Sequence, residues 1–272
     1  MKLAACNEMF SGRSWEDVCR TLSLHGYHGV EIAPFTFARS VREIGAGQRA
    51  RIRETAERFG LEVVGLHWLL AKTHGYHLTH PDRRVRQATS AYLVDLVHFC
   101  ADVGGRVLVF GSPKQRSLLP GVSMEQAFEF AAEVLRPACE AAAERGAVLA
   151  FEPLARSETD FVTSADEARK LIERVSHPGL RLHLDAKAMA AEARSMDAVV
   201  KAHAGLLEHV HVNDVNLLGP GMGELDLWPL ISALREVGYE GYLSVEVFDT
   251  SPGPERILAE SKAYLERLLS RL

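Results

Sequence analysis

The chain has 272 residues, of which 47% are hydrophobic and 25% charged, a composition typical of folded globular proteins and not of disordered ones. Its formal net charge of −5 argues against nucleic-acid binding, which usually requires a basic surface. The four cysteines show no CxxC spacing, and no apolar run approaches the roughly 20 residues that span a bilayer. We therefore expect a soluble, cytoplasmic protein with reduced thiols and no membrane segment.

Short apolar runs alternate with helical patterns along the whole chain. The runs predict strands at 3–6, 30–34, 61–66, 107–110, 148–153, 180–185, 209–214 and 243–248. Helical patterns follow them at 14–25, 49–58, 82–103, 123–146, 164–177, 195–203, 226–237 and 254–272.

Eight strand-then-helix units of about 34 residues each predict a single (β/α)8 TIM barrel domain over residues 1–272. The strands are nearly continuous runs of Val, Leu, Ile and Ala, as expected of parallel strands buried on both faces. An open doubly wound sheet fits less well, because no G-x-G-x-x-G follows the first strand.

Polar residues stand near the C-terminal ends of four successive predicted strands. They are Glu152, Asp185, His211 and Glu246. A closed barrel aims neighbouring strand ends at one point, where three carboxylates repel each other unless a cation lies between them. Three carboxylates and one imidazole suit Mn²⁺, Mg²⁺, Co²⁺ or Zn²⁺. We predict a catalytic metal site, and the plain alternative for Glu152 is an ion pair with a neighbouring Arg or Lys.

Two further histidines precede these residues on the same strands. His183 and His209 lie two positions before Asp185 and His211, so strand alternation places them on the same inward face, one layer deeper. We expect them to hydrogen-bond to the ligands and not to bind the ion themselves.

The ordered motifs resemble the sugar isomerase/epimerase family of xylose-isomerase-like TIM barrels. The resemblance rests on Phe151-Glu152-Pro153-Leu154, His183-Leu184-Asp185, His209-Val210-His211-Val212, Ser244-Val245-Glu246-Val247, Val30-Glu31-Ile32 and the glycine turns at 219–223 and 238–241. It covers the whole chain and implies one divalent ion, with Mn²⁺ favoured, held by the four residues named above. It also implies that Glu152 and Glu246 are the catalytic acid/base pair.

The resemblance implies substrate-binding residues as well. Glu158 matches the position where ketose 3-epimerases hold the terminal hydroxyl end of the sugar, and His67 and Glu31 match positions that line the pocket. Lys187 is a candidate to hold a substrate oxygen or phosphate, although a solvated loop lysine explains it equally well. Trp68 and the His-rich segment after it are candidates to cover the pocket.

Two departures from the family pattern bear on the substrate. Ala188 stands where those ketose 3-epimerases carry a substrate-binding His, and Leu217 stands where they carry an Arg. Both changes argue against a free-ketose 3-epimerase of that type. The additional zinc-binding histidines of the superfamily's abasic-site endonucleases are also missing, near 110–112 and at Ala188, which argues against a DNA-repair nuclease.

The implied activity is a metal-dependent isomerase or epimerase that moves a proton next to the carbonyl of a sugar or sugar-like hydroxy-ketone through an enediolate. Expulsion of a β-hydroxyl from the same enediolate would make a dehydratase or lyase instead. A non-catalytic sugar-binding barrel is the third alternative. In each case the partner is a small carbohydrate, and the apolar faces of the outer helices are compatible with a homodimer.

Overall fold

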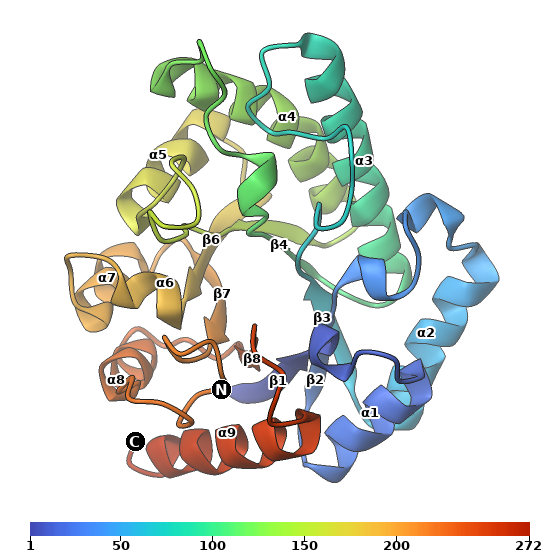
Figure 1. Ribbon diagram of the computed structural model, residues 1–272, viewed down its shortest axis with the longest axis vertical. Helices are drawn as coiled ribbons and strands as arrows, with labels where there is room; N and C mark the ends of the chain where they lie inside the picture. The colour runs from blue at the N-terminus through green and yellow to red at the C-terminus, as the bar shows by residue number, and fades with distance from the viewer.

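Eight parallel strands pair in chain order in the computed structural model, which describes residues 1–272, and β1 pairs with β8 to close the barrel (Figure 1). The strands are β1 Lys2–Cys6, β2 Gly29–Ile32, β3 Glu62–Leu66, β4 Val107–Phe110, β5 Val148–Phe151, β6 Leu180–Asp185, β7 Leu207–Val212 and β8 Tyr242–Val245. The predicted (β/α)8 barrel is confirmed.

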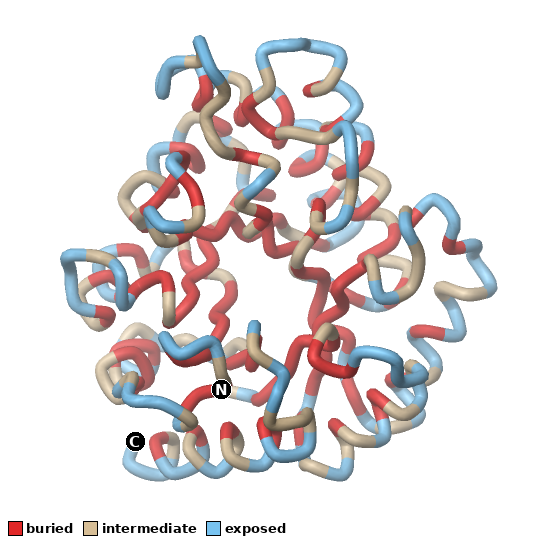
Figure 2. The backbone as a smooth tube through the Cα atoms, viewed as in Figure 1, coloured by how far each residue is buried: buried red, intermediate tan, exposed pale blue.

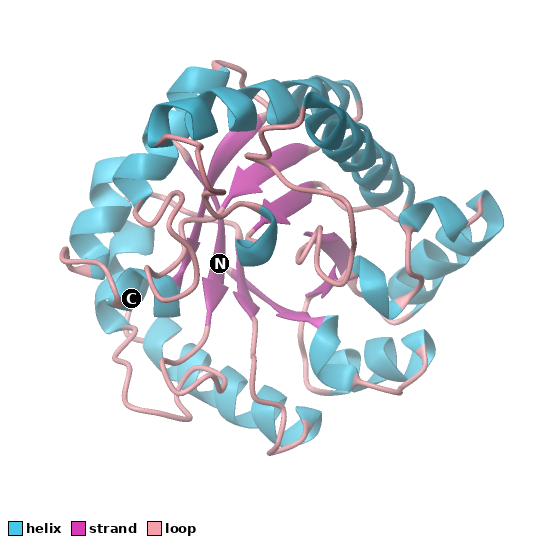
Figure 3. Cartoon of the chain, turned by 45° about the horizontal axis from the view of Figure 1, so that its top comes forward, coloured by secondary structure: helices cyan, strands magenta, loops and turns pink.

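The helices form a ring outside the strands, as the tilted view of Figure 3 shows. They are α1 Trp15–Leu24, α2 Ala46–Arg58, α3 Arg83–Asp102, α4 Met124–Glu144, α5 Ala165–Val175, α6 Ala186–Ala190, α7 Met196–His203, α8 Trp228–Glu236 and α9 Pro254–Leu269. Four 3₁₀ turns lie between them: η1 Asn7–Phe10, η2 Pro34–Thr36, η3 Val41–Glu43 and η4 Pro113–Gln115. None of the helices is both long and apolar enough to cross a membrane.

Polar caps fix where several helices begin. The Ser14 side chain accepts a hydrogen bond from the Asp17 backbone at the start of α1. Ser123 and Gln126 form a complete capping box at the start of α4, in which each side chain accepts from the other residue's backbone N–H. These caps place the helix starts close to the predicted positions.

Buried residues concentrate in the barrel wall and on the inner faces of the helices (Figure 2). Of the apolar ones, 71 form one contiguous cluster, so the molecule has one core and not two. All four cysteines lie buried and unpaired. The buried polar side chains include Glu152, Asp185, His211 and Glu246, at the C-terminal ends of four strands.

The short helix α6 was not predicted, and it matters for the site. Asp185 is both the last residue of β6 and the N-cap of α6, where its Oδ1 accepts a hydrogen bond from the Ala188 backbone at 2.8 Å. The chain turns directly from the strand into the helix at this carboxylate, which holds Asp185 in a fixed direction.

Candidate metal centre and adjoining cavities

Four side chains from successive strands meet at the mouth of the barrel. Glu152 and Glu246 are the first residues after β5 and β8, Asp185 ends β6, and His211 is the next-to-last residue of β7. One ligand atom from each lies within 4.8 Å of the others, and all four residues are buried. The structure thus brings together the four residues that the sequence singled out as metal ligands.

His211 is oriented as a metal-binding histidine would be. Its Nε2 lies 3.0 Å from the Glu31 carboxylate, which fixes the ring. Its Nδ1 lies 3.3 Å from Oε2 of Glu246 and is buried without a hydrogen-bond partner. A ligating imidazole commonly has one nitrogen held by a carboxylate while the other faces the ion. The unpartnered Nδ1 therefore fits a cation between His211 and the three carboxylates.

The carboxylates are held in place by neutral donors. Asp185 Oδ2 accepts a hydrogen bond from the Asn213 amide at 2.6 Å, and Glu246 Oε1 accepts one from the Trp68 indole at 2.6 Å. Both donors are neutral, but the His67 ring also contacts Glu246, with its Nδ1 3.3 Å from Oε1. Asn213, two residues beyond His211 in the chain, was not identified from the sequence as a site residue.

Negative charge is crowded in this cluster. Burial, together with the nearby charge of Glu246, raises the pKa of Glu152 well above its usual value and that of Asp185 to about 6. Burial also opposes ionisation of Glu246, but His211 and His67 outweigh it and hold the pKa of Glu246 below its usual value. Such a set of buried, competing carboxyls would be relieved by a divalent cation, and three oxygens with one nitrogen suit Mn²⁺, Mg²⁺, Co²⁺ or Zn²⁺.

The alternative explanation for Glu152 was an ion pair with a basic neighbour. The fully buried Arg116 is that neighbour, but its Nη1 donates to the Glu152 backbone carbonyl at 2.6 Å, and no ion pair joins it to the carboxylate. Burial, which outweighs the pull of the Glu152 and Glu158 charges, lowers the pKa of Arg116 to about 10. The Glu152 carboxylate thus remains available to the cluster.

Gly111 makes room for Glu152. A Cβ atom at Gly111 would overlap Oε2 of Glu152, although the backbone there is not in the left-handed region. The glycine, which follows β4 directly, is required for space and not for conformation.

The expected substrate-binding residues divide into two groups. Trp68 and Glu158 line a cavity of about 390 Å³ that also reaches Glu152 and Glu246. Lys187 lies beside it, where its Nζ pairs with Glu158 at 2.9 Å.

His67 and Glu31, by contrast, were expected to line the pocket but are not among the residues that line this cavity. Both are almost completely buried. Glu31 is enclosed by His209 and His211, and the His67 ring lies between Glu246 and Glu8. Glu31, on β2, contacts His211, and His67, the first residue after β3, contacts Glu246.

The deeper histidines behave differently from each other. Both were predicted to hydrogen-bond to the proposed ligands, but His209 hydrogen-bonds through Nε2 to Glu31, which in turn contacts His211. His183 makes no hydrogen bond, and its Nδ1 lies 3.9 Å from Glu152. Burial and the neighbouring imidazoles lower the pKa of His183 well below the usual value. Its ring packs against that of His211, with the ring centroids 4.2 Å apart.

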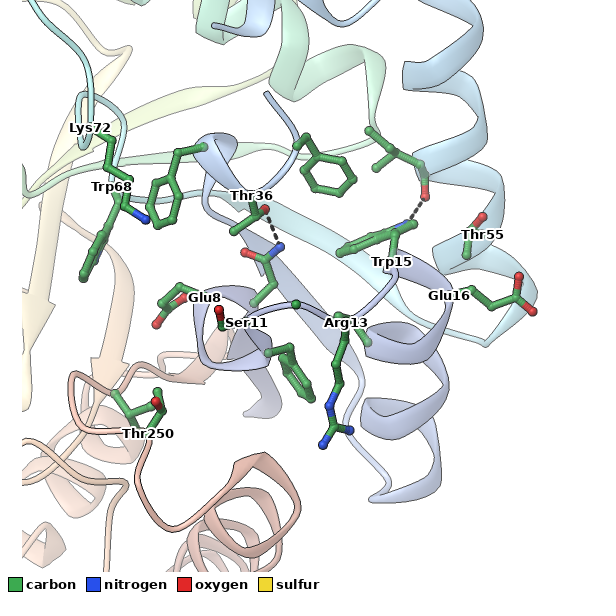
Figure 4. Close-up of a pocket in the computed structure, with 18 of the residues that line it drawn as sticks. Glu8, Ser11, Arg13, Trp15, Glu16, Thr36, Thr55, Trp68, Lys72 and Thr250 are labelled. Atoms are coloured by element: carbon green, nitrogen blue, oxygen red, sulfur yellow. Dashed lines mark hydrogen bonds between the residues drawn. The ribbon is translucent and has the colours of Figure 1, made fainter. Parts of the chain in front are cut away.

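A second cavity, of about 740 Å³, adjoins the first. Trp68, Lys72 and Phe248 line both cavities, so the two meet at these side chains. Figure 4 shows Glu8 next to Ser11 on one wall of the second cavity. Neither the cavity nor Glu8 was predicted from the sequence.

Comparison with known proteins identifies the family. The family model of the xylose isomerase-like TIM barrel matches residues 19–268. The chain belongs to this family.

The similarity between this chain and individual relatives extends over different fractions of the two sequences. D-Psicose 3-epimerase of Ruminiclostridium cellulolyticum is 24% identical over 177 residues, which span 63% of this chain and only 59% of that protein. 3-Dehydro-D-guloside 4-epimerase of Escherichia coli K12 is 25% identical over 97% of this chain and 99% of its own. The crystal structure of D-psicose 3-epimerase with D-tagatose from Clostridium cellulolyticum H10 superposes with a TM-score of 0.85 at 20% identity, covering 99% of both chains.

Proposed function

We propose that this protein is a divalent-metal-dependent epimerase or isomerase of a sugar or sugar-like hydroxy-ketone. The observation that carries the proposal is the buried cluster of Glu152, Asp185, His211 and Glu246 at the mouth of the barrel. The similarity to a sugar 3-epimerase and a sugar 4-epimerase supports the same chemistry, while the two names differ in the carbon that is epimerised.

The four clustered residues would hold one divalent ion, with Mn²⁺ the ion we favour. When bound, the ion would supply positive charge next to the substrate's carbonyl oxygen and so make the neighbouring carbon more acidic. Asn213 and the α6 backbone orient Asp185, and Glu31 orients His211.

Glu152 and Glu246 would act as the acid/base pair. Glu152 follows β5 and Glu246 follows β8, and the two strands β6 and β7 lie between them in the ring. Their carboxyls therefore reach the cavity from different sides. One takes the proton from the carbon next to the carbonyl, and the other returns a proton to the opposite face or to the adjacent carbon. Trp68 donates a hydrogen bond to Oε1 of Glu246, and Oε2 faces Nδ1 of His211 at 3.3 Å.

Proton exchange with solvent tests the proposal. The protein is incubated in D₂O with Mn²⁺ and a panel of ketoses, aldoses, their phosphates and inosose-type ketones, and carbon-bound deuterium is measured by NMR. We expect deuterium next to the carbonyl of at least one sugar, and loss of exchange on adding a chelator. Exchange followed by loss of a hydroxyl would identify a lyase. No exchange with any substrate would contradict the proposal and favour a sugar-binding barrel.

A further inference from the structure

One acidic residue that lines the second cavity, Glu8, is buried without hydrogen-bond donors. The Glu8 side chain is only 8% exposed; its Oε2 has no partner but the His67 ring, and its Oε1 is buried without any partner. Leaving a buried carboxylate without donors is costly, so a donor is expected to occupy this place during function. Glu8 lines the cavity, which is therefore where that donor would come from.

Glu8 lies a short and defined distance from the clustered residues. Its Oε2 is 3.0 Å from Nε2 of His67, out of line for a hydrogen bond, and Nδ1 of the same ring is 3.3 Å from Oε1 of Glu246. A single imidazole ring thus separates the two carboxylates. A sugar whose reacting carbon lies near Glu246 could reach Glu8 with its next chemical group.

Aromatic rings line the passage between the two cavities. The Trp68 ring stacks near Phe248, with centroids 6.0 Å apart, and lies 5.8 Å from Phe35. Rings with a polar group placed among them are typical of sites that bind small molecules. The other acidic residue of the cavity, Glu16, is 52% exposed and pairs with Arg58 at 3.0 Å. Unlike Glu8, it is therefore hydrated and has a cationic partner.

We propose that this cavity is a subsite for a substituent carried by the sugar, and that Glu8 binds the substituent through its hydroxyl or ammonium donors. The preferred substrate is then a conjugated sugar, such as a glycoside or an amino-substituted ketose, and not a free monosaccharide. This inference rests on the proposed function, because it places the sugar's reacting end at the clustered residues.

A comparison of free and conjugated sugars as substrates tests the inference. The value of kcat/KM is measured for a free ketose, for the same ketose carrying a glycosyl group, and for the same ketose carrying an aminoalkyl group. We expect the wild-type protein to prefer one conjugate over the free ketose, and Glu8→Gln to lower that ratio about tenfold, since it removes a charge-assisted hydrogen bond. The conjugate whose ratio falls shows whether hydroxyl or ammonium donors bind Glu8.

The matched control is Glu16→Gln, the same substitution at the exposed acid of the same cavity, which should leave the ratio unchanged. If Glu8 serves only as a partner of His67, Glu8→Gln will change kcat/KM for free and conjugated sugars equally, and the inference is overturned. It is also overturned if the wild-type protein does not prefer either conjugate. Should Glu8→Gln not fold, Glu8→Asp withdraws the carboxylate while keeping its charge and gives the same comparison.

Binding without turnover separates this inference from the proposed function. Alditols, in which the carbonyl is reduced, are titrated by calorimetry with and without the glycosyl or aminoalkyl group. We expect the conjugated alditol to bind more tightly, and Glu8→Gln to weaken its binding about tenfold. Equal binding of plain and conjugated alditols contradicts the subsite, whereas tight binding of a conjugate with no turnover of any ketose contradicts only the proposed function.

Discussion

The two sides of the barrel mouth are built differently. On the side of β5 to β8, the clustered carboxylates and imidazole stand at strand ends, where the sheet's hydrogen bonds fix their backbone. The second cavity is lined by η1, α1, η2, α2 and the segments after β3 and β8, so most of its wall lies on the side of β1 to β3. Groups on strands are positioned accurately, and groups on connecting segments can differ in size and chemistry at little cost to the fold. We therefore assign the reaction to the first side and the choice of substrate to the second.

The largest effect is expected at the strand-end side. Glu246→Gln should lower kcat by about 10²–10⁴-fold, because the amide cannot take up a proton from carbon. It should reduce bound metal far less, since the three other ligands remain; metal content is measured on the purified variant. A parallel loss of metal and activity would reduce Glu246 to a ligand without a catalytic role.

Gly111→Ala tests the same side of the barrel mouth without replacing any candidate ligand. The added methyl group overlaps the Glu152 carboxylate and should displace it, and a displacement of about 1 Å can cost on the order of 10²-fold in rate. We expect kcat/KM to fall by about 10–100-fold while the melting temperature changes little. Gly205→Ala is the control, because a Cβ there meets no atom within 4 Å. Equal activity of the two variants would mean that Glu152 is free to move.

Trp68 lies where the two sides meet. Trp68→Phe keeps the aromatic wall but removes the indole hydrogen bond to Glu246. Hydrogen bonds to charged groups contribute about 1.5–3 kcal/mol, so we expect kcat/KM to fall about tenfold. Trp228→Phe, at the start of α8 on the outer ring, is the control and should have no such effect. A change in KM alone would assign Trp68 to binding and not to orienting Glu246.

The smallest effect concerns the cavity side and its stability. The Asn7 side chain accepts a hydrogen bond from the Ala33 backbone at 2.8 Å and donates to Thr36 at 2.9 Å, which ties η1 to η2. Asn7→Ala should lower the free energy of unfolding by about 1–3 kcal/mol, because it leaves a buried N–H unsatisfied. Ser11→Ala, an exposed change on the same cavity, should stay within about 0.5 kcal/mol. Chemical denaturation of both variants makes the measurement.

The strand-end side was predictable because a charged residue inside an apolar run is conspicuous. Glu152, Asp185, His211 and Glu246 each stand at the end of a largely apolar run, and successive members are about one strand-plus-helix unit apart, so the barrel and the clustered residues could be inferred together. Strand boundaries were less accurate: Glu152 and Glu246 lie one residue beyond their strands.

The cavity side could not be predicted in the same way. Glu8 stands in a short polar stretch after β1, and its surroundings are supplied by His67 and Trp68, about 60 residues away in the chain. Arg116 stands in a polar loop segment of the sequence, where an arginine is usually solvated. Three-dimensional packing nevertheless buries it completely. Burial of this kind depends on which segments pack together, and a local pattern does not carry that information.

The order of the strands has a consequence for how such enzymes diversify. The proposed acid/base and ligand residues all come from the second half of the chain, whereas Glu8, Phe35, His67 and Trp68 come from its first quarter. Exchange of that N-terminal quarter between homologous genes would change the second cavity, provided that Glu31, His67 and Trp68, which contact His211 and Glu246, are kept. A chimera with the first quarter of a relative and the remainder of this chain is thus a direct route to altered sugar selectivity by design.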